Sequence, residues 1–266
     1  MSTYVFSDVH GHRAALERAL AQVSPQPDDC FYCLGDMVDR GPDPIGVLSL
    51  LHDMPHCTVL MGNHEALMLS CLRDPNDATF AMEWVMNGGA TTSEGLDELT
   101  DEQCDEVLTW VRGLPLWAHV NVGGRDYILT HAGIDPGRAW IPEEWTEASI
   151  ARMMQDQLPD DLIWIREDFW GRPTGLVDEN GVGPIVVAGH TPTPYLDRMA
   201  DRPDRPGLGP DLRAHMVRVG ACKATGGVSD RWDIDAGAAG GSDFGQVLIV
   251  RLDDGHEFYE PVLAGE

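Results

Sequence analysis

Basic side chains are scarce in this chain. Its 266 residues include 18 lysines and arginines against 44 aspartates and glutamates, and the single lysine is Lys223. The formal net charge is therefore −26 at pH 7. A field this negative argues against a nucleic-acid duplex or an anionic membrane surface as a general partner. Salt adaptation would produce such acidity, and so would an arginine-rich coding bias combined with a well-solvated surface.

Long apolar runs are also missing. No stretch approaches the roughly 18 consecutive apolar residues of a membrane span. The first residues lack the basic segment followed by an apolar one that marks a signal peptide. We therefore expect no membrane partner, no signal peptide and a cytoplasmic location, where the six cysteines would stay reduced. Cys30 and Cys33 have the spacing of half a zinc site or of a redox pair. No second pair matches them and they lie in an apolar run, which favours thiols buried in a strand.

Apolar runs typical of strands alternate with amphipathic helical stretches in the first part of the chain. The strands are expected at 3–7, 30–34 and 58–61. This alternation predicts a parallel or mixed sheet covered by helices. Residues 73–113 are mainly helical in pattern, and Thr100 with Gln103 forms a capping box before the last apolar-periodic segment.

Strand patterns return after residue 114. They are expected at 117–122, 127–130, 184–188, 232–235, 246–251 and 257–262, and a strand-like Trp-Ile run lies at 163–165. Gly123 and Gly124 mark a hairpin turn between the first two. Residues 197–230 show little periodicity, and so long a connection is typical of a functional or mobile segment. The absence of an internal repeat and of a linker predicts a single domain over residues 1–266.

Metal-type ligands follow the ends of five apolar strands. They are Asp8 and His10, then Asp36, then Asn63 and His64, then His131, and finally His190. One histidine after a strand is more often a solvated or capped turn residue. Because parallel strands bring their carboxyl ends to one edge of a sheet, five recurrences predict that these side chains converge.

The candidate ligands combine oxygen and nitrogen atoms without a thiolate. That set suits Mn²⁺, Fe or Zn²⁺ better than Mg²⁺ or Ca²⁺, which prefer shells of oxygen alone. A single four-coordinate ion that keeps a position open for water does not need so many ligands. Two ions about 3.5–4 Å apart, sharing one carboxylate, would use them all. We therefore expect two divalent ions as cofactors, with Mn²⁺ first and Fe or Zn²⁺ as the alternatives.

Five short motifs carry these ligands. They are Asp8-x-His10-Gly11, Gly35-Asp36-x-Val38-Asp39-Arg40-Gly41, Gly62-Asn63-His64-Glu65, His131-Ala132-Gly133 and Gly189-His190-Thr191. In this order, over residues 3 to about 250, they resemble the phosphoprotein phosphatase family of calcineurin-like metallophosphoesterases, closest to its bacterial and phage lambda phosphatase branch. The resemblance implies an α/β fold, a β-sandwich of two mixed sheets flanked by helices.

The resemblance also implies the metal ligands. One ion would be bound by Asp8, His10 and Asp36, and the other by Asp36, Asn63, His131 and His190. Asp36 would be the shared carboxylate. A hydroxide bridging the two ions would attack phosphorus directly, without a covalent intermediate.

Four further residues would act on the substrate according to the same resemblance. His64 would protonate the leaving group, and Asp39 would orient His64. Arg40 and Arg166 would bind the phosphate by paired charge-assisted hydrogen bonds. Taken alone, Arg166 would more often pair with a neighbouring acid on the surface.

These features predict a phosphatase whose partner is a phosphoprotein or a small phosphate ester. The first substrate class is phosphoserine or phosphothreonine in proteins. The alternative is a symmetrical dinucleoside tetraphosphate or another small phosphate compound. Asp39 favours the first class, because the related tetraphosphatases typically replace this aspartate. A third interpretation, an inactive metal-binding scaffold, is disfavoured because no ligand is missing.

Overall fold

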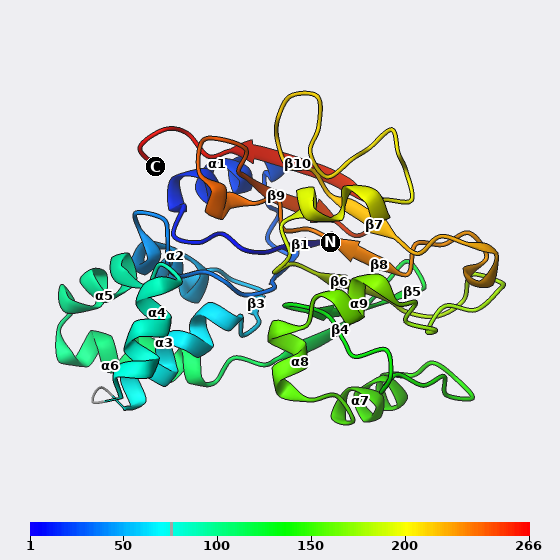
Figure 1. The fold of residues 1–266 in the computed structure, drawn as a ribbon, viewed down its shortest axis with the longest axis horizontal. Coiled ribbons are helices and arrows are strands. Elements are labelled where there is room, and N and C mark those ends of the chain that lie inside the picture. The colour runs from blue at the N-terminus through cyan, green and yellow to red at the C-terminus, as the bar shows by residue number, and fades with distance from the viewer. Residues whose placement is uncertain (75–76) are drawn as a thin grey trace.

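Two mixed sheets of five strands each form the centre of the protein (Figure 1). The computed structural model describes residues 1–74 and 77–266. The strand orders are β10-β9-β1-β2-β3 in the first sheet and β4-β5-β6-β8-β7 in the second. Helices flank both sheets, so the predicted α/β fold with two mixed sheets is confirmed.

The first sheet combines strands from both ends of the chain. Its members are β1 (Thr3–Phe6), β2 (Cys30–Cys33), β3 (Cys57–Val59), β9 (Gln246–Arg251) and β10 (His256–Pro261). β1 pairs in parallel with β2, and β2 with β3, whereas β9 pairs antiparallel with both β1 and β10. The carboxyl ends of β1, β2 and β3 therefore lie side by side, and each is followed by one of the motifs.

The second sheet begins with the predicted hairpin. Its strands are β4 (Trp117–Val122), β5 (Arg125–Thr130), β6 (Ile185–Ala188), β7 (Val217–Val219) and β8 (Arg231–Asp233). Gly123 and Gly124 join β4 to β5 with φ of 59° and 84°, conformations that suit glycine. β5, β6 and β8 run parallel, and β7 pairs antiparallel with β8.

Alternating strand residues divide the core into three apolar clusters. The cluster between the sheets includes Val5 and Leu248 from the first sheet and Leu129 and Val187 from the second. The outer face of the first sheet packs against α1 (Arg13–Val23), α2 (Pro44–Asp53), α3 (Asn63–Arg73), α4 (Ala78–Met86), α5 (Ala90–Asp97) and α6 (Asp101–Arg112). The outer face of the second packs against α7 (Glu147–Gln155), α8 (Pro159–Trp164) and α9 (Glu167–Gly171).

The predicted helical character of residues 73–113, as far as they are described, and the predicted capping box are confirmed. Residues 78–112 hold three helices, and the capping box before α6 forms between Thr100 and Gln103. Among the described residues, no helix has both the length and the apolar character needed to cross a membrane. The part of residues 73–113 at positions 75 and 76 lies outside the described residues.

Two local predictions are wrong. The Trp-Ile run does not form a strand, because α8 ends at Trp164. Pro159 at the first helical position and two acidic residues in the first turn favour a helix there. Residues 197–230 are not one irregular connection either. They contain the end of a 3₁₀ helix, η1 (Thr193–Met199), and β7, whose three residues are too few to show a period.

Candidate metal centre

The five motifs meet at one cavity of about 200 Å³. Of the predicted site residues, those that line it are Asp8, His10, Asp36, Arg40, Asn63, His64, Arg166 and His190. His131 and Asp39 are fully buried and contact these residues. The structure therefore brings together all ten residues that the sequence suggested.

The prediction that all the candidate ligands meet at the edge of one sheet is wrong. Asp8, Asp36 and Asn63 follow β1, β2 and β3 of the first sheet, whereas His131 and His190 follow β5 and β6 of the second. The β4–β5 hairpin starts a new sheet, and the loops of both sheets reach the same cavity. Backbone hydrogen bonds join the loops within each sheet: Asp8 N donates to Gly35 O at 3.1 Å in the first, and Gly189 N donates to His131 O at 2.8 Å in the second. Between the sheets, His190 N donates to the Asp8 carboxylate at 3.0 Å.

Backbone strain is concentrated in the motif loops. The motif residues with positive φ, between 46° and 71°, are Asp8, His10, Asp36, Asp39, Arg40 and His190. Residues with a Cβ seldom adopt this region, and each such residue costs roughly 1–3 kcal/mol unless the surrounding structure enforces it. The surrounding backbone bonds do so here, since His10 N donates to Asp36 O and Gly41 N to His10 O, both at 2.9 Å. Strain of this kind is typical of functional sites.

Asp36 lies between two groups of potential metal ligands. His10, Asp36 and His64 place one ligand atom each within 4.8 Å of one another, and so do Asp36, His131 and His190. The two oxygens of Asp36 face different groups: Oδ2 is 3.6 Å from His10 Nε2, and Oδ1 is 3.5 Å from His131 Nε2. This arrangement suits a carboxylate shared by two ions.

Asp8 differs from the arrangement that the resemblance implied. His64, rather than Asp8, completes the group around His10, and the Asp8 carboxylate accepts from His190 N at 3.0 and 3.2 Å. Asp8 still lines the cavity beside His10 and Asp36. Its carboxylate is therefore available to the same space, although its present partner is a backbone amide.

At the second group, a lone pair of His131 faces a lone pair of Asn63. The ring of His131 donates from Nδ1 to Leu34 O at 3.0 Å, because a carbonyl can only accept. Its Nε2 therefore carries a lone pair, and Asn63 Oδ1, another acceptor, lies 2.8 Å away. Two converging acceptors without a proton between them fit a cation, so the residues present suit a divalent metal ion.

Burial keeps the candidate histidine ligands neutral. It lowers the pKa of His10, His131 and His190, and neighbouring histidine and arginine charges lower the pKa of His10 and His190 further. A neutral imidazole is the form that binds a metal ion. Burial also raises the pKa of Asp36 well above its usual value, an effect that a bound cation would reverse.

His64 and Asp39 form a buried hydrogen-bonded pair. His64 Nδ1 lies 2.6 Å from Asp39 Oδ2, and Asp39 also accepts from Trp84 Nε1 and Thr92 Oγ1. Burial alone would lower the pKa of His64, but the Asp36 charge and the bond to Asp39 raise it above the usual value. The pair can therefore hold a protonated imidazole in a fixed orientation.

The two arginines reach the cavity from opposite parts of the chain. Arg40 Nη2 donates to His64 Nε2 at 2.9 Å, and Arg166 Nε donates to His190 Nε2 at 3.0 Å. Arg166 does not pair with its acidic neighbours, and it directly precedes α9 instead of following a strand. Both guanidinium groups are thus positioned beside candidate metal ligands, where an anion would meet them.

Sequence reasoning missed two kinds of residue. Glu65 belongs to a quoted motif, yet its role appears only in the structure: the buried carboxylate accepts from Asp36 N at 2.9 Å, Met37 N at 2.7 Å and Gly62 N at 2.9 Å. Asp235 lines the cavity, and burial together with Asp8 raises its pKa. Its position at the end of a predicted strand was the signal that could have found it.

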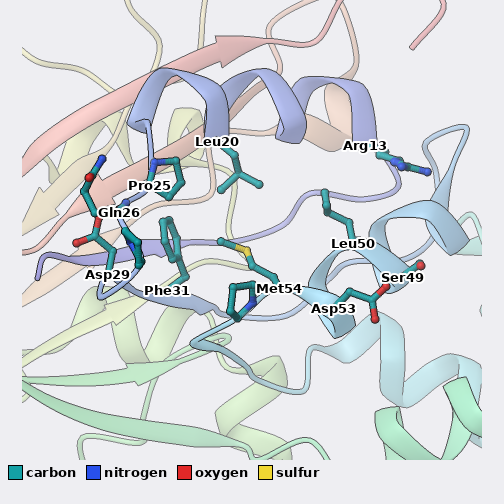
Figure 2. A pocket seen from close by; sticks show the side chains of 12 residues that line it. Arg13, Leu20, Pro25, Gln26, Asp29, Phe31, Ser49, Leu50, Asp53 and Met54 are labelled. Carbon is teal, nitrogen blue, oxygen red and sulfur yellow. Dashed lines mark hydrogen bonds between the residues drawn. The ribbon is translucent and has the colours of Figure 1, made fainter.

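A second cavity lies away from the motifs (Figure 2). It measures about 470 Å³, and the side chains of Leu20, Phe31 and Met54 converge in it between α1 and the end of α2. None of the motif residues lines it. The candidate site residues therefore belong to the smaller cavity.

The chain matches the calcineurin-like phosphoesterase family over residues 1–219. One relative is the symmetrical bis(5'-nucleosyl)-tetraphosphatase of Acidovorax sp. (strain JS42), which is 34% identical over 149 residues, 54% of this chain and 47% of the relative. Another is serine/threonine-protein phosphatase 2 of Salmonella typhimurium, 26% identical over 200 residues, 75% of this chain and 84% of the relative. The chain spans about half the length of the tetraphosphatases that it matches.

Solved structures agree on the fold. A structure described provisionally as a diadenosine tetraphosphatase has a TM-score of 0.57 at 19% identity, with 99% of this chain and 94% of that one covered. A serine/threonine phosphatase of Saccharomyces cerevisiae has a TM-score of 0.52 at 16% identity, with 100% and 81% covered. The protein belongs to the calcineurin-like metallophosphoesterase family.

Proposed function

We propose that the protein is a phosphomonoesterase that removes phosphate from phosphoserine and phosphothreonine side chains of proteins. The observation that carries this proposal is the buried contact of 2.6 Å between His64 Nδ1 and Asp39 Oδ2. An alkoxide leaving group is strongly basic and needs a proton, so an oriented general acid matters most for alkyl phosphates. A cavity of about 200 Å³ is also suited to a phosphate group with a short alkyl stem.

The proposed cofactors are two divalent ions, with Mn²⁺ as the first candidate. Asp8, His10 and Asp36 would bind one of them, and Asp36, Asn63, His131 and His190 the other. When bound, the ions would supply a hydroxide nucleophile near neutral pH and offset the charge of the phosphate. The facing lone pairs of His131 and Asn63 and the two-sided position of Asp36 support this assignment.

The remaining site residues would bind the phosphate and move one proton. Hydrolysis forms a bond from a water oxygen to phosphorus and breaks the bond from phosphorus to the ester oxygen, which leaves as an alkoxide. Protonated His64 would give its Nε2 proton to that oxygen while Nδ1–H stays bonded to Asp39. Arg40 would turn from His64 to the phosphate, and Arg166 would bind the other phosphate oxygens.

A second candidate is the hydrolysis of symmetrical dinucleoside tetraphosphates. The names of relatives that are 31–34% identical to this chain favour it. The Salmonella phosphatase, which this chain covers more fully, favours the first candidate. The single domain over residues 1–266 and the cytoplasmic location stay predictions.

A comparison of the two substrates tests the proposal. Mn²⁺-loaded protein would be given a phosphothreonine peptide and diadenosine tetraphosphate in separate assays, and kcat/KM would be compared. We expect the peptide to have the higher value. A clear preference for the nucleotide would overturn the proposed substrate and establish the second candidate, and Asp39→Ala would then leave nucleotide hydrolysis nearly unchanged.

A further inference from the structure

Arg231 is a buried arginine outside the cavity. It is the first residue of β8 and is 3% exposed. Its Nε donates to Asp230 Oδ1 at 2.9 Å, and the side chain of Asp230 is buried as well. Replacing a buried ion pair with apolar residues of the same volume is often neutral or stabilising. Stability alone is therefore a weak reason for this pair to lie in the core.

The rest of the Arg231 guanidinium is directed at the backbone of α9. Nη1 lies within hydrogen-bonding distance of three carbonyls, those of Phe169, Trp170 and Arg172, at 2.9, 2.6 and 2.8 Å. These carbonyls lie at the C-terminal end of the helix, where the last carbonyl groups have no hydrogen-bond donor within the helix. The positive charge also complements the negative end of the helix.

Asp230 holds the chain just beyond α9. Its Oδ2 accepts from Thr174 N at 3.0 Å and from Thr174 Oγ1 at 2.7 Å. The backbone of Asp230 is fixed to the sheet, because Val186 N donates to Asp230 O at 3.0 Å. The pair thus connects residues 169–174 to the second sheet by charge-assisted bonds, which are stronger than neutral ones.

Arg166 lies at the opposite end of this short helix. It precedes α9 directly, and its carbonyl accepts from Trp170 N at 3.0 Å. A helix of five residues is not stable by itself. The position of Arg166, and of its guanidinium beside His190, therefore depends on the contacts that hold α9 against the sheet.

We propose that Arg231, paired with Asp230, is a positioning residue that determines how tightly Arg166 binds phosphate. This inference rests on the phosphate-binding role proposed for Arg166. A guanidinium binds two phosphate oxygens only in a narrow range of positions. A small shift of α9 would replace a two-point contact with a weaker one, although Arg231 itself does not touch the substrate.

Arg231→Lys tests the inference with limited damage to the core. Lysine keeps a positive charge beside Asp230 but lacks the planar donors for the α9 carbonyls. Inorganic phosphate would be measured as a competitive inhibitor of p-nitrophenyl phosphate hydrolysis by the Mn²⁺-loaded protein. We expect its Ki to rise roughly tenfold, as for the loss of one charge-assisted hydrogen bond. Arg218→Lys is the matched control in the neighbouring strand β7, where the guanidinium lies over Trp232, and its Ki should not change.

A double variant separates this inference from the role of Arg166. If Arg231 acts through Arg166, then Arg231→Lys adds nothing to Ki in an Arg166→Ala background. An unchanged Ki in the single Arg231→Lys variant, or an equal rise in both backgrounds, would overturn the inference while leaving the proposed function intact. An Arg166→Ala variant with an unchanged Ki would disprove the phosphate role of Arg166, and the inference would fall with it.

Hydrogen exchange at the Trp170 amide gives an independent readout. We expect faster exchange there in Arg231→Lys, with the amides of β6 unaffected; unchanged exchange at Trp170 would count against the inference. Should Arg231→Lys not fold, Thr174→Ala removes the hydroxyl bond to Asp230, together with the longer bond of 3.3 Å that the hydroxyl accepts from Leu176 N. It should raise Ki in the same direction by a smaller factor, and an unchanged value would overturn the proposal.

Discussion

Asp39 fixes the proton of His64 on the ring nitrogen that faces away from the cavity. Their side chains lie 2.6 Å apart, Nδ1 to Oδ2. On the other side of the ring, Arg40 Nη2 lies 2.9 Å from Nε2. Because arginine only donates, Nε2 must accept, which leaves the proton on Nδ1 to be donated to Asp39. Nε2, which faces the cavity, is therefore the nitrogen that would exchange a proton with substrate in the proposed mechanism, once Arg40 has turned to the phosphate.

His64→Asn should lower kcat far more than it changes KM. Removing a general acid costs roughly 10²–10⁴ in rate, whereas the phosphate contacts remain. Steady-state kinetics with an alkyl phosphomonoester would measure both constants. His119→Asn is the matched control, because His119 Nε2 lies 2.8 Å from Asp126 Oδ1 in a similar pair outside the cavity. An unchanged kcat for His64→Asn would remove it from the acid role.

Thr92→Val should reduce both stability and kcat. Thr92 Oγ1 donates to Asp39 Oδ1 at 2.6 Å and accepts from Asp39 N at 2.9 Å, and the residue is fully buried. Valine has the same shape but leaves the buried Asp39 N without its partner, at about 1–3 kcal/mol, while Asp39 Oδ1 keeps its bond from Trp84 Nε1. Urea unfolding would measure the loss of stability, and kcat should fall severalfold as Asp39 loses a partner. Thr109→Val, on the exposed side of α6, should do neither.

Gly189→Ala should weaken metal binding. A Cβ at this position would overlap the Asp8 carboxylate and the Ser7 hydroxyl, so Asp8 would have to move. We expect the Mn²⁺ concentration for half-maximal binding to rise roughly tenfold, by analogy with the loss of an outer-shell contact. Calorimetric titration of the metal-free protein would measure it. Gly113→Ala is the control, because a Cβ there meets only ordinary contacts at 3.4 Å or more.

Cys57 should make the fold less stable at alkaline pH. Burial raises the pKa of its thiol from 9.0 to about 12. An unfolded chain loses this proton near pH 9 while the folded chain keeps it. The contribution to stability is therefore complete below pH 9 and is lost as the pH rises towards 12. Urea unfolding between pH 8 and 11 should show a shallower decline for Cys57→Val, by up to about 1.4 kcal/mol per pH unit.

The candidate ligands could be found in the sequence because each comes just after an apolar run that is typical of a strand. Asp8, Asp36 and His190 need no knowledge of distant contacts to be noticed. Their convergence followed from general rules for the carboxyl ends of parallel strands. Those rules do not show that the ligands come from the loops of two different sheets. The capping box at Thr100 was also predictable from a local pattern, because its two partners are only three residues apart.

The residues that the sequence did not reveal act through contacts far apart in the chain. Glu65 accepts hydrogen bonds from two backbone amides of the Asp36 loop, 28 and 29 positions earlier in the chain. Thr92 contacts Asp39 across 53 positions, and Arg231 contacts Phe169 across 62. No local period marks such pairs. Asp235 lies at the end of a predicted strand and has apolar neighbours. Its place in the cavity depends on other segments of the chain, so the sequence around it did not indicate a role.

Metal stoichiometry measured together with turnover tests the central claim most directly. Protein stripped with a chelator would be titrated with Mn²⁺, and the bound ions per chain would be counted while p-nitrophenyl phosphate hydrolysis is followed. Two ions per chain at full activity, and no turnover in the stripped protein, are the predicted result. Turnover that survives complete removal of metal would contradict a dinuclear centre built on Asp36.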